Sequence, residues 1–151
     1  MHLPVMLDDL VATKRALADS FREVSLGHPQ DTDVHFLTMA FARECDEQVS
    51  ELRELSRRFD GPFPADSGGV EIRSLMRAHA GPLGLLRDLQ ELHARTDRVI
   101  TICQAVRQAA LVLDDRSLVR AVDACREQTQ KQMDWLRTAL DKASPQALIV
   151  G

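Results

Sequence analysis

The chain has 151 residues and a formal net charge of −4 at pH 7, and a domain of this length buries about two thirds of its unfolded surface. Its composition is 44% hydrophobic but only 4% aromatic, with no Tyr, which favours helix packing over a β-sandwich. Positive and negative side chains are interspersed along every segment, so the sequence lacks the concentrated basic face that nucleic-acid binding requires. We therefore expect an all-α protein without a nucleic-acid partner.

Two helices are predicted in the first part of the chain. The first covers about residues 5–26, because apolar residues recur at three- and four-residue steps and Gly27 and Pro29 follow. The second covers about 31–59, with a carboxylate of 31–33 capping its first amides and Asp60-Gly61-Pro62 marking its end. The apolar stripes of these two helices are Leu7, Leu10, Leu17, Phe21 and Val24, and then Phe41, Cys45, Val49, Leu52 and Leu55.

Residues 60–84 are rich in glycine and proline, with a short amphipathic stretch at 70–79, and we interpret them as a connection within a single domain, 1–151. A connection of this length reaches over about 50 Å when extended. It can therefore return along the bundle, so that the third helix runs parallel to the second. This is the connectivity of a ferritin-like four-helix bundle with a long crossover between helices 2 and 3. A plain up-down-up-down bundle, with the connection folded on itself, is the alternative.

The third helix is predicted over about 82–113 and the fourth over about 116–143. Pro82 is compatible with a first helical turn, a tight link at 114–117 separates the two helices, and Pro145 is expected to end regular helix. Their apolar stripes are Leu86, Leu89, Ile100, Cys103, Val106 and Ala110, and then Leu118, Val122, Cys125, Met133, Leu136 and Leu140.

The three cysteines, Cys45, Cys103 and Cys125, fall one to a helix without CxxC spacing, so neither a disulfide framework nor a zinc site is indicated. We interpret them as reduced core residues. The first residues lack the basic start of a signal peptide, and no apolar run approaches membrane-spanning length. We therefore expect a cytoplasmic protein that does not bind membranes.

Segments 42–49 (ARECDEQV), 108–115 (QAALVLDD), 132–138 (QMDWLRT) and 144–148 (SPQAL) resemble small bacterial ferritin-like four-helix bundle proteins of uncharacterised function. In iron-oxidising relatives, the first and third helices each supply a carboxylate, and the second and fourth each supply Glu-x-x-His. Here no Glu or Asp is followed three residues later by His: the second helix offers Glu44 with Glu47, and the fourth offers Glu127 with Gln130. The resemblance therefore implies the fold with a degenerate metal site.

Polar residues lie on or beside the inner stripes, several of them four residues apart on one helix face. One interpretation is a polar layer that fixes helix register, with Lys14 opposite Glu44 and His93 bonded to Asp97. The other is a small ligand pocket in the bundle interior. The residues in question are Lys14, Glu44, Gln48, His93, Asp97, Gln128 and Gln132. In addition, His35 and His79 are placed to meet at one end of the bundle, without a third metal ligand.

Two functional hypotheses follow. In the first, the protein is not an enzyme, has no cofactor, and acts as a homo-oligomer, a dimer in the simplest case, or by binding a protein partner through a second apolar face. Residues available for that face are Val11, Phe36, Met39, Val119 and Trp135. In the second, the protein is a ferritin-like metalloprotein or oxidase that binds iron or manganese through an atypical set, Glu44, Glu47, His93, Asp97 and Glu127.

Overall fold

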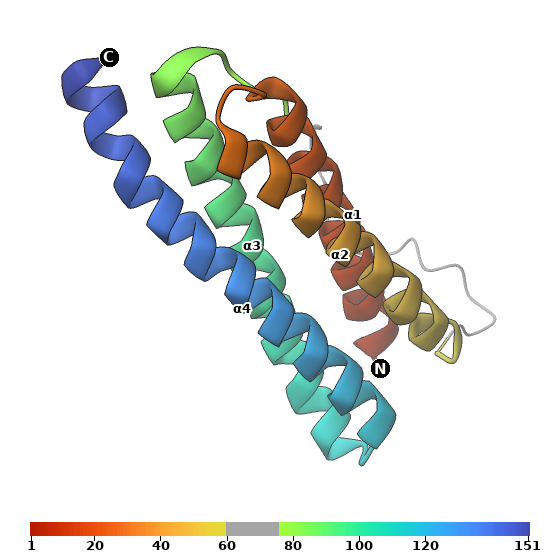
Figure 1. Ribbon diagram of the computed structural model, residues 1–151. Helices are drawn as coiled ribbons and strands as arrows, with labels where there is room; N and C mark the ends of the chain where they lie inside the picture. Colours follow the sequence, from red (N-terminus) through yellow and green to blue (C-terminus); the bar gives the residue numbers. More distant parts are fainter. Residues whose placement is uncertain (60–75) are drawn as a thin grey trace.

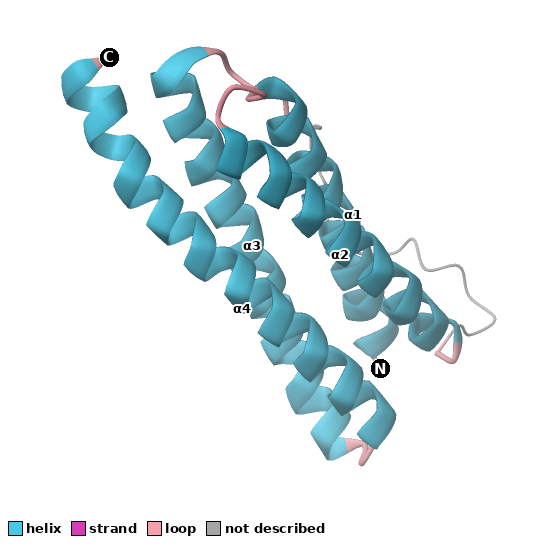
Figure 2. Cartoon of the chain, in the orientation of Figure 1, coloured by secondary structure: helices cyan, strands magenta, loops and turns pink. Residues whose placement is uncertain are grey.

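The computed structural model describes residues 1–59 and 76–151, and regular structure in those residues consists of helices without strands (Figure 2). Four α-helices span Leu3–Gly27 (α1), Thr32–Arg57 (α2), Gly81–Val112 (α3) and Arg116–Pro145 (α4), and a π-helical turn, η1, spans Gln146–Val150. The predicted all-α class is confirmed. Within the described residues, none of these helices combines the length and apolar character that a membrane crossing needs.

The helix starts follow local signals, with one exception. The Asp115 carboxylate accepts a hydrogen bond from the backbone N–H of Leu118 at 3.1 Å, which caps α4 and lowers the pKa of Asp115. Asp31 occupies the same position before α2, but its side chain makes no capping hydrogen bond. Its carboxylate lies 3.9 Å from Nδ1 of His28 instead. The predicted carboxylate cap of α2 by Asp31 is therefore wrong.

The predicted stop at Pro145 is correct only for the α-helical geometry. α4 includes Pro145, and the chain stays helical through η1 to Val150. Proline has no N–H to donate, and its ring crowds the carbonyl four residues earlier. The change to the wider π-type turn directly after Pro145 coincides with that interruption. The predicted connection at 60–84 and its amphipathic stretch at 70–79 lie largely outside the described residues.

Figure 1 shows α1 and α2 as one antiparallel pair and α3 and α4 as another, with α1 packed against α3. At one end of the bundle, the same hollow is lined by Gly27, the last residue of α1, by Asp31 before α2, by Pro82 of α3 and by Ala143 of α4. At the other end, the guanidinium of Arg58, just after α2, lies 3.3 Å from the carboxylate of Asp115. Helices α2 and α3 therefore begin at the same end and run in the same direction.

The core is built from the predicted leucine stripes, with Leu7, Leu10 and Leu17 fully buried on α1. Val11, predicted to belong to a second contact face, is only 9% exposed and is part of this core. That placement on an outer face is wrong, because the buried side of α1 is wider than one stripe and includes Val11 between Leu10 and Leu17. Trp135 is half-buried and packs edge-on against Phe41 at 5.5 Å between ring centroids.

Candidate functional site

The first candidate site lies in the middle of the bundle and contains a fully buried lysine. The Lys14 side chain on α1 has no exposed surface, and its Nζ donates a hydrogen bond to Thr129 Oγ1 on α4 at 2.7 Å. The Thr129 hydroxyl in turn donates to the backbone carbonyl of Cys125. Among the residues that the structure describes, no carboxylate forms an ion pair with Lys14. A buried amine without an opposite charge is costly, so its immediate neighbours matter.

Those neighbours are the three cysteines. Cys103 on α3 and Cys125 on α4 are both buried free thiols with 3.7 Å between their sulfur atoms. The hydrogen bond from Cys103, and after it the charge of Lys14, lower the pKa of Cys125 to about 7, although burial acts in the opposite direction. Donating that bond raises the pKa of Cys103, and its burial adds to the effect. Cys125 is therefore the group in this layer with the strongest tendency to ionise.

Cys45 on α2 completes the layer from the other side. Burial raises its pKa to about 11, despite the nearby charge of Lys14 and a hydrogen bond to Gln132. The Gln132 amide nitrogen also donates to Glu44 Oε2 at 3.1 Å, which ties α4 to α2. We call Lys14, Cys45, Cys103, Cys125, Thr129 and Gln132 the mid-bundle layer. It satisfies the prediction of polar contacts across the interior, but the predicted pairing of Lys14 with Glu44 is replaced by Lys14–Thr129 and Gln132–Glu44.

Gln48 and Gln128 extend this layer toward the α2–α4 contact. The Gln48 amide donates to the backbone carbonyl of Ala124 at 3.2 Å, while its Oε1 is buried without a hydrogen-bond partner among the described residues. Oε1 of Gln128 is likewise buried without a hydrogen-bond partner among the described residues. Three hollows on the described surface are lined by other residues, and none of them by these glutamines or by the mid-bundle layer. The predicted pocket residues Lys14, Glu44, Gln48 and Gln132 therefore cross the interior without lining any of these hollows.

The remaining predicted ligands point elsewhere. His93 is half-buried and accepts a hydrogen bond at Nε2 from Arg137 at 3.3 Å, so the predicted bond to Asp97 is wrong. Asp97 and Glu47 are exposed, and the Glu127 carboxylate lies 3.8 Å from Lys131. Within residues 1–59 and 76–151, no group of three or more His, Cys, Asp and Glu side chains is arranged to hold a metal ion. The alternative metal set is therefore spread along the helices and not assembled.

A second candidate site lies at the end where α2 and α3 begin, around a buried carboxylate. Asp88 on α3 has no exposed surface, and its two oxygens lie 2.7 Å from His28 Nε2 and 2.7 Å from His79 Nδ1. The backbone N–H of His79 also donates to it at 2.9 Å. We call these three residues the bundle-end cluster. His35, predicted to meet His79, bonds to Ser25 instead, with 2.7 Å between its Nδ1 and the Ser25 carbonyl oxygen.

The bundle-end cluster borders the hollow shared by the four helix ends, whose volume is ≈ 520 Å³. His28 lines this hollow, and its Nε2 is engaged by Asp88. A nearby glycine sets the packing here: a Cβ added to Gly27 would lie 2.2 Å from Cβ of Ala78. The chain leading into α3 therefore approaches the end of α1 closely enough to require glycine, which places His79 over Asp88.

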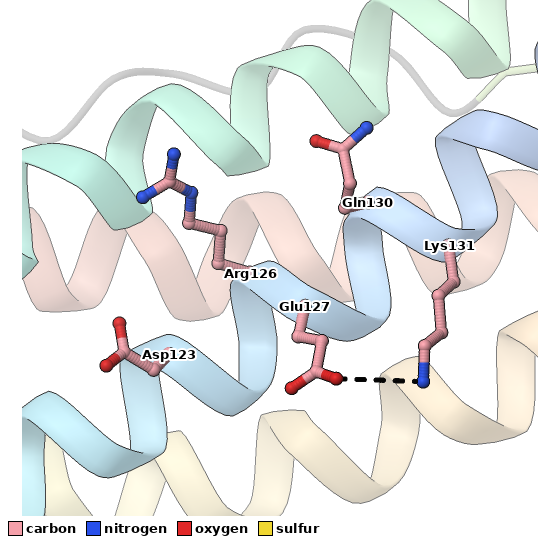
Figure 3. A pocket seen from close by; sticks show the side chains of 5 residues that line it. All are labelled: Asp123, Arg126, Glu127, Gln130 and Lys131. Atoms are coloured by element: carbon pink, nitrogen blue, oxygen red, sulfur yellow. Dashed lines mark ion pairs between the residues drawn. The ribbon is translucent and has the colours of Figure 1, made fainter.

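A further hollow of ≈ 410 Å³ lies along α4 (Figure 3). Its lining side chains point in different directions, and Glu127 forms an ion pair with Lys131. Asp123, also in the lining, is bound to Arg107 at 2.6 Å. The lining residues are Asp123, Arg126, Glu127, Gln130 and Lys131. Because these groups diverge and Asp123, Glu127, Gln130 and Lys131 already have partners, this hollow is an open groove without convergent chemistry.

Sequence reasoning found Lys14, Glu44, Gln48 and Gln132 but missed Thr129 and the gathering of the three cysteines around Lys14. Cys45, Cys103 and Cys125 each lie at an apolar stripe position, and nothing along the sequence indicates that their three helices bring them to the same height. Asp88 was missed as well, although an acidic residue between Leu86 and Leu89 on an apolar stripe was an available signal. Comparisons with protein-family models, curated proteins and solved structures found no match to this chain.

Proposed function

We propose that this chain is a ferritin-like four-helix bundle that has lost its metal centre and acts by self-association as a homodimer. The fold assignment is supported by helix direction, because α2 and α3 begin at the same end of the bundle (Figure 1). One long crossover between two antiparallel helix pairs is the ferritin-like connectivity. Residues 60–75 of that connection lie outside the described part of the chain.

The observation that carries the proposal of self-association is an accumulation of exposed apolar side chains at that same end. Phe36 in the second turn of α2 is 65% exposed, and Ile149 in η1 is 83% exposed. The full set, which we call the apolar end, is Leu26, Phe36, Leu83, Leu148, Ile149 and Val150. Isolated exposed apolar residues are common, but a concentration of large ones at one end of a domain marks an association surface.

A second copy of the chain is the partner that we assign to this end. In a twofold dimer the same patch meets itself, so an apolar patch needs no separate complementary surface. The opposite end of the bundle also carries exposed apolar residues, namely Leu111, Val112 and Leu113 at the end of α3 and Met1 and Met6 at the start of α1. If both ends associated with each other, the contact would be head-to-tail and would build open filaments, so we assign the dimer to the apolar end alone.

Sedimentation velocity of wild type and two variants tests the dimer. We expect wild type to sediment as a dimer and Ile149→Asp to sediment as a monomer with an unchanged helical circular dichroism spectrum, because a charge at the contact is desolvated without a partner. Val112→Asp is the matched control, since Val112 is 87% exposed at the opposite end. It should remain dimeric. A monomeric wild type, or dissociation by Val112→Asp alone, would contradict the proposal.

The loss of the metal centre is supported by the donor set and by the partners that its members already have. Glu44 is engaged by Gln132, Glu127 by Lys131 and His93 by Arg137, each on the surface or across helices. We also propose that the protein resides in a reducing compartment, the cytoplasm, because Cys103 and Cys125 lie 3.7 Å apart as thiols.

A further inference from the structure

We propose that Cys103 and Cys125 are a redox-active dithiol that a small peroxide oxidises to a disulfide between α3 and α4, with Lys14 as the residue that holds the reacting thiolate. This activity is independent of self-association, since it depends on Lys14, Cys103 and Cys125 and not on the apolar end.

The two sulfur atoms are already in contact. They lie 3.7 Å apart on antiparallel neighbouring helices, and Cys103 donates its S–H to Cys125. A disulfide requires a separation of about 2.05 Å, so bond formation needs the sulfurs to approach by less than about 2 Å. Cys45 has a different neighbour, with 3.8 Å between its sulfur and Oε1 of Gln132.

Lys14 makes the two thiols of this pair unequal, because its buried amine lies beside Cys125. Its side chain is fully buried, and the hydrogen bond it makes is to the neutral hydroxyl of Thr129. No carboxylate pairs with Lys14 in the described parts of the chain, and its charge acts on the thiols of Cys45, Cys103 and Cys125, whose pKa values it lowers. A buried ammonium is strongly destabilised unless an anion lies near it. Thr129 joins Lys14 to the backbone of Cys125, which sets Cys125 beside the amine.

The three thiols then differ in a way that selects one nucleophile. The pKa of Cys125 is lowered to about 7 by the hydrogen bond from Cys103 and by the charge of Lys14, whereas burial raises the pKa of Cys45 to about 11. The thiolate is the nucleophilic form of cysteine, so at neutral pH Cys125 has the larger thiolate fraction and is the nucleophile that we assign. Cys103, as the protonated donor next to it, is placed to resolve the product.

The reaction has two balanced steps. The Cys125 thiolate attacks one oxygen of hydrogen peroxide, forming an S–O bond as the O–O bond breaks, and the departing hydroxide takes a proton to become water. Cys103 then gives up its proton and attacks the sulfur of the Cys125 sulfenic acid. The S–O bond breaks, a second water leaves, and the disulfide remains. The two thiols lose two electrons and the peroxide gains two.

Mass spectrometry of the folded protein after exposure to hydrogen peroxide tests the proposal. The expected product has lost two hydrogen atoms, contains a Cys103–Cys125 disulfide in its peptide map, and retains a free thiol at Cys45. In Cys103→Ser, which keeps a hydrogen-bond donor next to Cys125 but removes the resolving thiol, the sulfenic acid on Cys125 should persist and be trapped by dimedone. Cys45→Ala is the matched control and should oxidise like wild type. If the thiols react only after unfolding in urea, or if Cys45 is the residue oxidised, the proposal is wrong.

A second variant separates the charge of Lys14 from its packing. Lys14→Met keeps the length and apolar stem of the side chain but removes the amine. We expect oxidation at pH 7 to slow by about fivefold or more, because raising the pKa of Cys125 by one unit from about 7 lowers its thiolate fraction at pH 7 from about one half to about one tenth. The pH profile of the rate should shift to higher pH. An unchanged profile in a folded Lys14→Met protein would remove Lys14 from the mechanism and contradict the proposal.

Discussion

The mid-bundle layer and the bundle-end cluster both bury an ionisable side chain completely, but they compensate it differently. Asp88 has no exposed surface and is bound by His28, by His79 and by a backbone N–H, all of which donate to a carboxylate. Lys14 is equally buried, but its amine donates a hydrogen bond to the neutral hydroxyl of Thr129 and otherwise has thiols nearby. The comparison teaches that burial alone does not identify function: a fully bonded group anchors the fold, while an uncompensated one perturbs its neighbours.

Removing Asp88 and removing Lys14 should therefore have opposite effects on the free energy of unfolding. This difference is the largest effect we expect. Asp88→Ala leaves His28 buried without its acceptor, so the free energy of unfolding should fall by about 3 kcal/mol. Lys14→Met should leave stability at pH 7 unchanged or raise it by about 1 kcal/mol, because Cys125 then keeps its proton and no charge is left behind. Urea denaturation of each variant measures both.

Asp97→Ala is the control for Asp88→Ala, because Asp97 lies on the same helix and is exposed. Its effect should be within about 0.5 kcal/mol. Equal destabilisation by Asp88→Ala and Lys14→Met would show that the two sites are compensated alike, and the comparison would fail.

The bundle-end cluster can be tested again through the glycine that places it. Gly27→Ala should destabilise the protein by about 1–3 kcal/mol, because the new Cβ would lie 2.2 Å from Cβ of Ala78 and the backbone before α3 would have to move. Elsewhere in a helix, this substitution is favourable by up to about 1 kcal/mol. The double variant Gly27→Ala with Ala78→Gly should recover most of the loss. Additive losses in the double variant would show that the contact is not the cause.

The mid-bundle layer should appear in the dependence of stability on pH. Cys125 has a pKa of about 7 in the folded protein against 9.0 as its ordinary value, so between these limits the unfolded chain holds a proton that the folded state has released. Stability should therefore rise from pH 7 to about 9, and this contribution is lost as pH falls through 7. Lys14 favours the thiolate and Glu51 opposes it.

Above about pH 9 the sign reverses, because the raised pKa values of Cys103 and Cys45 keep protons on the folded state that the unfolded chain releases. Chemical denaturation from pH 7 to 10 should give a maximum near pH 9. In Cys125→Ala the rise between pH 7 and 9 should disappear while the fall above it remains. A rise of the same size in Cys125→Ala would assign it to other groups.

The smallest effect concerns the far end of the bundle. Asp115→Ala removes the cap of α4 and the contact with Arg58, which is half exposed, and should cost about 1 kcal/mol by thermal or chemical denaturation. Asp141→Ala, a substitution of an exposed acid on the same helix without loss of the cap, is the control. A loss below about 0.3 kcal/mol would contradict the role of Asp115 as the cap.

The fold was largely predictable because helix period, breakers and caps are local. Leu7, Leu10 and Leu17 recur along one side of a helix, and Gly27 and Pro82 mark helix boundaries close to those observed. The candidate sites were less predictable, because they depend on the relative heights and rotations of different helices. Lys14 was identified as an interior polar residue, but its partner Thr129 is a small residue on α4 that the sequence does not distinguish from other threonines.

The burial and partners of His93 and His28 could not be predicted from the sequence for a related reason. His93 lies on a helical stripe and was given weight for that, but it is half-buried and bonds to Arg137. His28 lies in the link between α1 and α2, where helical periodicity gives no information about burial. It is nevertheless only 5% exposed and is bound to Asp88. Links that meet at a bundle end are brought together by tertiary packing, and no local pattern encodes that meeting.

The central proposal is that the interior of this bundle holds thiols and an amine and does not bind a pair of metal ions. Elemental analysis of the protein purified without chelator tests it most directly. We predict less than about 0.1 equivalent of iron, manganese and zinc per chain, against about two equivalents for a di-iron centre. One or more equivalents that are lost in a folded Glu44→Gln or His93→Gln variant would contradict the account.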